Sequence, residues 1–294
     1  MFYRRKIILG LIELLGGEVE KLRLQKLLFL YTEKKPQPEY DFIPYKYGCY
    51  SYSAKADVNT MVRKGYLSET ENKYSKQDKS NYYQKLKPAD ARLLQEVVSD
   101  YGQMSRNALI KHTYLNFPFY AIKSTIAKDV LPGSLYDRVE KAIPTDEETT
   151  LFTIGYEGIS LETYLQKLVR NNVKLLVDVR KNPLSMKFGF SKTLLKKYCN
   201  SLDIEYFHIP EVGINSNKRQ QLETQTDYDR LFADYRKTTL SETDEAQLQI
   251  LGLLKKHKRI ALTCFEAEPC QCHRSHLAEA IAKSLDFNYR LKHL

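Results

Sequence analysis

The sequence predicts an α/β fold, in which a C-terminal three-layer domain with a mostly parallel sheet follows a smaller, mainly helical domain. After residue 151, short apolar runs alternate with amphipathic runs, as strands and helices do in proteins with a parallel sheet. Before that point, helical patterns dominate. A length of 294 residues exceeds that of most single domains, and a hydrophobic share of 43% suffices for two cores.

The expected domains are residues 1–128 and 151–294, joined by a connecting segment at residues 129–150. Pro132-Gly133 and Pro144 favour turns in this segment. Its six acidic residues outnumber its two basic ones, which sets its composition apart from that of the first domain.

The first domain opens with two helical patterns, at residues 21–34 and around residues 54–62, and Gly65 marks the end of the second. Two short strands are expected next, at "YLSETE" (66–71) and "NYYQKLK" (81–87), joined by the polar run "NKYSKQDKS". The apolar stripes of the two helices are Leu24, Leu27, Leu28 and Tyr31, and Ala54, Val58, Met61 and Val62.

This order of helices followed by a basic two-stranded wing resembles that of winged-helix domains, most closely over "VNTMVRKGYLSE" and "NYYQKLKPADARLL". The runs "LQKLL" (24–28) and "FIPYKYGCYS" (42–51) also resemble the Panacea, or SocA-like, antitoxin family. The winged-helix resemblance implies a helix that enters the major groove of DNA and a wing that contacts phosphates.

The net charge of +10 lies almost entirely in the first domain. Residues 1–128 contain 22 Lys and Arg against 13 Asp and Glu, whereas residues 129–294 contain 24 against 23. A basic domain suits a nucleic acid, with DNA as the expected form, although solubility alone also explains such a charge. The candidate nucleic-acid-binding residues are Lys55, Arg63, Lys64, Lys73, Lys76 and Lys79, with Tyr74, Tyr82 and Tyr83 interleaved.

Four strands are expected in the second domain, at residues 151–158, 173–180, 204–210 and 258–265. Helices are expected at residues 161–172, 191–202, 227–240, 244–257 and 273–285. Ligands of such folds bind at the carboxyl ends of the strands, so polar residues there predict a shared crevice. These residues are Gly155, Tyr156, Glu157 and Gly158 after the first strand, Asp178 and Arg180 at the second, His208 and Glu211 at the third, and Cys264 and Glu266 at the fourth.

Four motifs of the second domain, in the same order, resemble the family called domain of unknown function 488. They are "TIGYEG", "VDVRKNPLS", "FSKTLLKKYCNSLDIEYFHIPEVG" and "LTCFEAEPCQCHR", and together they span about residues 151–285. The resemblance implies an α/β domain with a polar crevice. The residues that it singles out are Gly155, Asp178, Arg180, Pro183, Ser185, Gly213, Cys264, Glu266, Cys272, His273 and Arg274.

Three of the five cysteines cluster at residues 264–272, directly before His273 and Arg274. An odd number of cysteines fits no disulfide framework and favours reduced thiols in the cytoplasm. Zinc would require Cys264, Cys270 and Cys272 with His273 or His276, but their spacing is poor for one ion, so we expect no metal and no cofactor. A redox pair is disfavoured by the C-x-C spacing. A nucleophilic thiolate beside Arg274, or simply buried cysteines, remain open.

Arg180 and Arg274 are expected to face one crevice and to share an anion, with Asp178, Glu266 or a ligand phosphate between them. An arginine in the first turn of a helix opposes the helix dipole, so Arg274 requires such an anion.

The sequence thus favours a nucleic-acid-associated enzyme that acts on a phosphate-bearing nucleotide or a DNA base, as a hydrolase of glycosidic or phosphate bonds. A non-enzymatic DNA-binding regulator or antitoxin and a cysteine-dependent transferase are the alternatives. We expect a cytoplasmic protein without a membrane span, and the sequence leaves the oligomeric state open. The candidate catalytic residues are Glu157, Asp178, Glu266 and Cys264. The candidate substrate-binding residues are Gly155, Tyr156, Arg180, Ser185, His208, Cys272, His273 and Arg274.

Overall fold

The computed structural model describes residues 1–215, 222, 224–284 and 286–294. The chain divides into two compact units, which we call the N-terminal unit (Met1–Ile143) and the C-terminal unit (Pro144–Leu294). No helix within the described ranges combines the length and the apolar character needed to cross a membrane.

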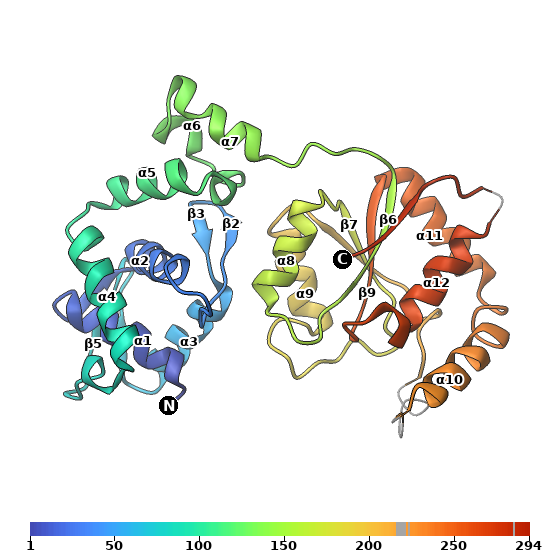
Figure 1. Cartoon of the computed structure of the whole chain (residues 1–294), viewed down its shortest axis with the longest axis horizontal. Coiled ribbons are helices and arrows are strands. Elements are labelled where there is room, and N and C mark those ends of the chain that lie inside the picture. The colour runs from blue at the N-terminus through green and yellow to red at the C-terminus, as the bar shows by residue number, and fades with distance from the viewer. Residues whose placement is uncertain (216–221, 223, 285) are drawn as a thin grey trace. The chain divides into compact units, whose positions relative to one another are not determined.

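The N-terminal unit is mainly helical (Figure 1). Its longer helices are α1 (Tyr3–Leu14), α2 (Lys21–Glu33), α3 (Tyr52–Arg63), α4 (Pro88–Tyr101) and α5 (Arg106–Asn116). Its strands are β1 (Glu18–Glu20), β2 (Ile43–Tyr45), β3 (Gly48–Tyr50), β4 (Leu67–Glu69) and β5 (Lys73–Lys76). Its short helical turns are η1 (Tyr83–Lys85), η2 (Pro118–Ala121), α6 (Ala127–Val130), η3 (Gly133–Leu135) and α7 (Asp137–Ala142).

Two small antiparallel sheets accompany these helices. Strand β5 lies between β1 and β4 in one sheet, and β2 pairs with β3 in the other. The apolar stripes expected for α2 and α3 lie in one core with α1: Leu27 and Tyr31 of α2 and Val58 and Met61 of α3 are all buried.

The prediction of a strand at residues 81–87 is wrong. The second strand of the hairpin is β5, which lies in the run that we expected to be a turn. The alternation of that run places Tyr74 in the core between polar neighbours, as a half-buried strand requires. Residues 83–85 instead form η1, because the Glu13 carboxylate accepts hydrogen bonds from the backbone N–H groups of Tyr82 and Tyr83.

The expected connecting segment, residues 129–150, contains η3 and α7, and Thr150 begins the first strand of the next unit. Val139 of α7 packs with Leu131 and Tyr114 in a small apolar cluster of the N-terminal unit. The division between the two units falls at Ile143 and Pro144.

The C-terminal unit alternates strands and helices, as its sequence predicts. Its strands are β6 (Thr150–Gly155), β7 (Leu175–Asp178), β8 (Glu205–His208), β9 (Arg259–Cys264) and β10 (Arg290–His293). Its helices are α8 (Leu161–Arg170), α9 (Lys192–Asn200), α10 (Gln225–Lys237), α11 (Asp244–His257), η5 (Pro269–Gln271) and α12 (His273–Ala282).

The five strands form one parallel sheet in the order β10-β6-β9-β7-β8. The fold class predicted from the sequence is therefore confirmed, as are the four predicted strands. Strand β10 was not predicted; its residues are mostly exposed and carry no apolar run, because it lies at the sheet edge.

Helices cover both faces of this sheet (Figure 1). On one face, Leu262 of β9 packs in a core with Leu254 of α11 and Leu277 of α12. Thr263, the next residue of β9, points to the opposite face, where its side chain accepts a hydrogen bond from Tyr164 of α8. Because both faces are covered, the central strands β6, β7 and β9 are fully buried and read as continuous apolar runs.

Candidate active site

The carboxyl ends of the three central strands lie side by side. Gly155, the last residue of β6, pairs with Cys264, the last residue of β9. Asp178, the last residue of β7, pairs with Thr263 of β9. Strand β9 thus lies between two strands that precede it in the chain, and the loops after all three strands meet at one edge of the sheet.

Asp178 and Arg180 form a buried ion pair at this edge. The Arg180 guanidinium donates from Nε to Asp178 Oδ1 at 2.8 Å and from Nη2 to Oδ2 at 2.5 Å. Its Nη1 donates to the Tyr156 hydroxyl and to the carbonyl oxygen of Phe190. Burial acts to lower the pKa of Arg180, but the hydrogen bonds and charge of Asp178 outweigh burial and raise it. Arg180 therefore carries a fixed positive charge at the end of β7.

The Asp178 carboxylate is fully engaged. Besides Arg180, it accepts a hydrogen bond from the Tyr206 hydroxyl, and burial together with the nearby carboxylate raises the pKa of Tyr206. The expected site residue His208 is engaged with backbone as well: its Nε2 lies 2.9 Å from the carbonyl oxygen of Arg180, which can only accept a hydrogen bond. Asp178 and His208 therefore stabilise the carboxyl end of β7.

Three residues contact the loop after β9. Arg274 donates from Nη1 to the carbonyl oxygen of Glu266 and from Nη2 to that of Ala267. The Glu157 carboxylate accepts a hydrogen bond from the backbone N–H of Ala267. Gly155 lies against the same loop, and a side chain there would overlap the carbonyl oxygen of Glu266. We conclude that Arg274, Glu157 and Gly155 all position this loop.

Within the protein, Arg180 and Arg274 have different hydrogen-bond partners, and a shared ligand anion stays a prediction. Arg180 is paired with Asp178, whereas Arg274 donates to backbone carbonyl oxygens. Arg274 is buried beneath the loop, and two carbonyl oxygens accept hydrogen bonds from its Nη1 and Nη2 atoms, while its Nε is buried without a hydrogen-bond partner among the residues that the structure describes.

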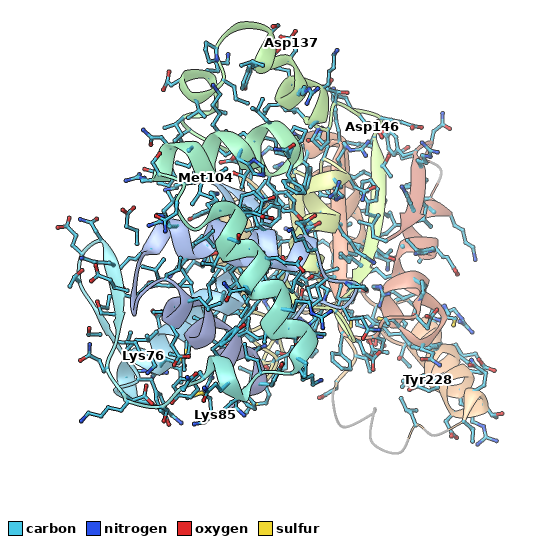
Figure 2. All side chains as sticks on the ribbon, turned by 60° about the vertical axis from the view of Figure 1, so that its left-hand side comes forward. Lys76, Lys85, Met104, Asp137, Asp146 and Tyr228 are labelled. Carbon is cyan, nitrogen blue, oxygen red and sulfur yellow. The ribbon has the colours of Figure 1, made fainter. Side chains whose placement is uncertain are left out.

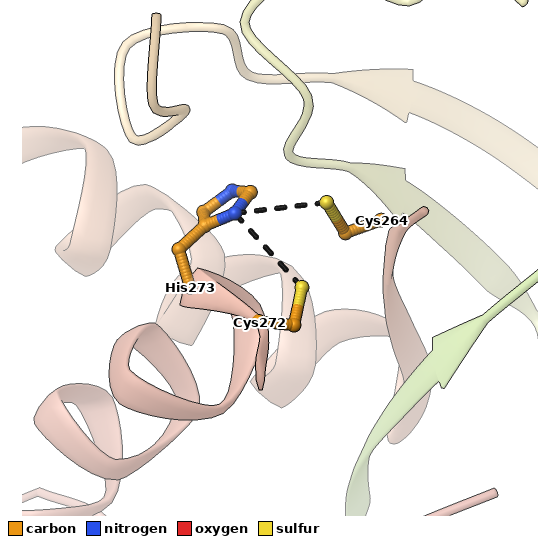
Figure 3. Close-up of side chains that lie close together, drawn as sticks. All are labelled: Cys264, Cys272 and His273. Atoms are coloured by element: carbon orange, nitrogen blue, oxygen red, sulfur yellow. Dashed lines mark hydrogen bonds between the residues drawn. The ribbon is translucent and has the colours of Figure 1, made fainter. Parts of the chain in front are cut away.

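Two thiols and an imidazole converge beside the loop (Figure 3). Cys264 Sγ lies 3.6 Å from His273 Nδ1, and Cys272 Sγ lies 4.0 Å from the same nitrogen. His273 Nε2 lies 3.0 Å from the carbonyl oxygen of Val179, so Nε2 carries the hydrogen and the lone pair of Nδ1 faces both sulfur atoms. Burial, and then the hydrogen bond with Cys264, raise the pKa of the Cys272 thiol.

Sequence spacing was a poor guide to this convergence. Cys272 has an extended backbone (φ −135°, ψ 135°) and caps α12, whose first residue is His273. This change of direction between adjacent residues lets both side chains point toward Cys264. Cys270, by contrast, is exposed and lines a different pocket with His276.

A pocket with a volume of about 300 Å³ opens at the strand ends. Of the predicted site residues, it is lined by Tyr156, Arg180, Ser185 and Cys264. Sequence reasoning missed Lys181, Asn182, Leu184, Ile214 and Phe265. Lys181 and Asn182 directly follow Arg180 in the motif "VDVRKNPLS", so their place in that motif was the available signal.

Several candidate nucleic-acid-binding lysines of the N-terminal unit have acidic partners. Lys55 pairs with Glu69, and Lys73 pairs with Glu18. Lys76 of β5, labelled in Figure 2, lies 3.3 Å from Glu13. Arg63, Lys64 and Lys79 have exposed side chains. Tyr74 and Tyr82 are buried core residues and not part of an exposed wing.

Comparison with known proteins gives a match to one protein family. No curated protein matches this sequence. The family model described as Domain of unknown function DUF488 matches residues 160–281, and this match confirms the resemblance of the C-terminal unit to that family.

Proposed function

We propose that the protein is a nucleic-acid-associated enzyme whose C-terminal unit hydrolyses a bond in a phosphate-bearing nucleotide or at a DNA base. The observation that carries this proposal is the contact of Cys264, at the pocket wall, with both a carboxylate and an imidazole. Cys264 Sγ lies 3.3 Å from Glu266 Oε2 and 3.6 Å from His273 Nδ1. Groups that transfer protons and a potential nucleophile thus meet beside a polar pocket.

The pocket lining suits a nucleotide. Lys181, Asn182 and Ser185 offer an ammonium, an amide and a hydroxyl group, all of which donate hydrogen bonds to phosphate oxygens. Phe265 presents an exposed aromatic ring, on which a base can stack. Phosphate donors and a stacking ring in one pocket favour a substrate that contains both groups.

Among the carboxylates predicted from the sequence, Glu266 is our choice for the general acid or base. The Asp178 carboxylate already accepts hydrogen bonds from Arg180 and Tyr206, and the Glu157 carboxylate accepts one from the backbone N–H of Ala267. Asp178, Glu157 and Arg180 are therefore positioning residues in this proposal, and Glu266 acts on the reacting atoms.

The Cys264–His273 contact favours a second candidate, a cysteine-dependent transferase. An imidazole lone pair that faces a thiol is the arrangement by which a histidine removes the proton of a nucleophilic cysteine. In that case alkylation of Cys264 abolishes turnover, and Glu266 is secondary.

The N-terminal unit supports the association with nucleic acid. Helix α1, strand β1, helix α2, the strand pair β2–β3, helix α3 and the hairpin β4–β5 follow one another, and β1 pairs with β5. This element order agrees with our proposal of a winged-helix-like module in which α3 approaches the DNA. Arg63 and Lys64 lie at the exposed end of that helix.

The test is turnover by the purified full chain. Nucleoside mono-, di- and triphosphates and DNA oligonucleotides with natural and modified bases are offered, and the products are identified by mass spectrometry. We expect Glu266→Gln to reduce turnover by about 100-fold or more, as the loss of a general acid or base does. Glu268→Gln, a change to an exposed glutamate in the same loop, is the matched control and retains activity. Turnover that is equal in the Glu266→Gln variant and the unaltered protein contradicts the proposal.

A further inference from the structure

We propose that Cys264, Cys272 and His273 form a binding site for one zinc ion, at the edge of the pocket. The inference deepens the proposed function, since it names the group that would activate water there. The three residues come from the end of β9 and the start of α12, and all three are buried.

The distances between the three donor atoms approach those of a tetrahedral zinc site. Zinc binds thiolate sulfur at about 2.3 Å and imidazole nitrogen at about 2.0–2.1 Å, which places neighbouring ligand atoms about 3.5–3.8 Å apart. His273 Nδ1 lies 3.6 Å from Cys264 Sγ and 4.0 Å from Cys272 Sγ. All three donor atoms lie within 4.8 Å of one another. Only small movements are needed for the three atoms to surround one ion.

The imidazole is already oriented as a ligand. Its Nε2–H donates to the carbonyl oxygen of Val179, which fixes the tautomer whose Nδ1 lone pair faces the two sulfur atoms. The ring of Tyr235 packs edge-on against the imidazole at 5.6 Å between ring centroids. A hydrogen-bonded second nitrogen of this kind accompanies almost every histidine that binds a metal.

The sulfur atoms of two thiols lie against one imidazole nitrogen at this point. The Cys264 thiol can donate its hydrogen to Glu266 Oε2, and the sulfur atoms of both Cys264 and Cys272 face Nδ1 of His273 (Figure 3). A cation shared by two thiolates and the imidazole uses all three donors at once. The preference of soft sulfur ligands for zinc over magnesium or calcium sets the class of metal.

A zinc ion bound by these three residues would have its fourth coordination position open toward the pocket. Cys264 lines the pocket, and the Glu266 carboxylate lies 3.3 Å from its sulfur atom. Three protein ligands plus a water molecule are typical of catalytic zinc, which lowers the pKa of the water to about 7. Glu266 is placed to accept the proton of such a water, and the resulting hydroxide is the nucleophile of the proposed hydrolysis. Cys264 is then a ligand, which excludes the transferase alternative.

The experiment measures metal on the full chain, purified in the presence of a reductant and without chelators. We expect about one zinc per chain by elemental analysis, as one three-ligand site requires. Cobalt(II) added after removal of zinc should give the thiolate-to-metal charge-transfer band and the intense visible bands of a tetrahedral site. Cys272→Ser should lose zinc in a chelator competition that the unaltered protein withstands. Cys270→Ser, which changes an exposed cysteine two residues away, should retain it.

The cobalt spectrum of the unaltered protein keeps the test valid if Cys272→Ser fails to fold. Absence of both zinc and a thiolate–cobalt band in the unaltered protein overturns the site, and so does equal zinc retention by Cys272→Ser. The experiments distinguish failure of the proposed function from failure of the proposed zinc site. Zinc binding without turnover of any substrate contradicts the enzyme and leaves the metal site, whereas turnover by metal-free protein contradicts the catalytic role of the zinc and leaves the enzyme.

Discussion

Arg274 donates a hydrogen bond from Nη1 to the backbone carbonyl oxygen of Glu266, at a distance of 2.5 Å. A second bond, from Nη2 to Ala267, makes the guanidinium a clamp on the loop that carries the proposed catalytic carboxylate. Arg274 is buried, so the clamp acts from beneath the loop and leaves the Glu266 side chain beside Cys264.

We predict that Arg274→Lys destabilises the C-terminal unit by about 1–3 kcal/mol, because a single ammonium cannot replace the fork that bonds two carbonyl groups. Urea denaturation followed by circular dichroism measures the change, and hydrogen exchange should show a loss of protection in residues 265–268. Arg290→Lys, at an exposed arginine, is the control and should change little. If Arg274→Lys left stability unaltered but weakened phosphate binding, the clamp would be wrong and a bound anion would be the partner.

Gly155→Ala should destabilise the same unit by about 1–3 kcal/mol, because its methyl group would overlap the Glu266 carbonyl oxygen. Gly252→Ala is the matched change: Gly252 lies exposed in α11 with no neighbouring atom near the new methyl group. That variant should gain about 0.5–1 kcal/mol, since alanine favours a helix interior. Thermal unfolding should show a lower midpoint for Gly155→Ala and a higher one for Gly252→Ala. Equal changes in the two variants would contradict the close contact between Gly155 and the Glu266 carbonyl oxygen.

The stability of the N-terminal unit should depend on pH through Asp90. This buried carboxylate accepts hydrogen bonds from Lys35, Tyr3 and Tyr31. Burial acts to raise its pKa, but these hydrogen bonds outweigh burial and lower it. A lowered pKa means that the unfolded chain binds the proton more readily. The contribution is therefore full above the unfolded pKa of about 3.9 and is lost as pH falls through the lower folded value.

Asp90→Asn should accordingly cost about 2 kcal/mol at pH 7, the usual loss for hydrogen bonds to a charged group. The difference from the unaltered protein should persist down to about pH 5 and shrink below about pH 4. Urea midpoints measured between these values test the prediction. Asp129→Asn, at an exposed position in α6, is the control. If the difference in stability between Asp90→Asn and the unaltered protein grew as the pH fell, the lowered pKa of Asp90 would be contradicted.

DNA binding by the full chain should depend on Arg63 and Lys64 more than on Lys73 and Lys76. The side chains of Arg63 and Lys64 are exposed, whereas carboxylates lie against the other two and already offset their charge. Changing Arg63 and Lys64 to Ala should weaken binding and lower the slope of log affinity against log salt by about 1 per lost phosphate contact. Gel-shift titrations at several salt concentrations measure this slope. Equal losses in both pairs of variants would refute the assignment to α3.

The sheet could be predicted from the sequence because its pattern is local. Buried parallel strands such as residues 175–178 are continuous apolar runs, and α8 shows a clear amphipathic repeat. The hairpin strand β5 could not be predicted, since four polar or aromatic residues carry too weak a signal. Strand β10 could not be predicted either, because it lies at the sheet edge, where mostly exposed side chains give no apolar run.

The candidate site was predicted as a set of residues but not as a set of contacts. One motif contains Cys264, Glu266 and His273, but only the folded chain shows which partner each residue takes. Arg274 is the clearest case, because backbone carbonyl groups are invisible in a sequence and their directions depend on the loop. The convergence of Cys272 with its neighbour likewise follows from a backbone angle and not from spacing.

The central place of β9 has a consequence for how the C-terminal unit folds. Strands β6 and β7 are made first, but they do not pair with each other, because β9 lies between them and is far later in the chain. Until β9 arrives, two apolar strands have open edges, and the contacts that close the sheet join distant parts of the sequence. Such a topology folds slowly and passes through aggregation-prone intermediates. We therefore expect synthesis of this protein to place a demand on chaperones, and its yield on expression to fall as temperature and synthesis rate rise.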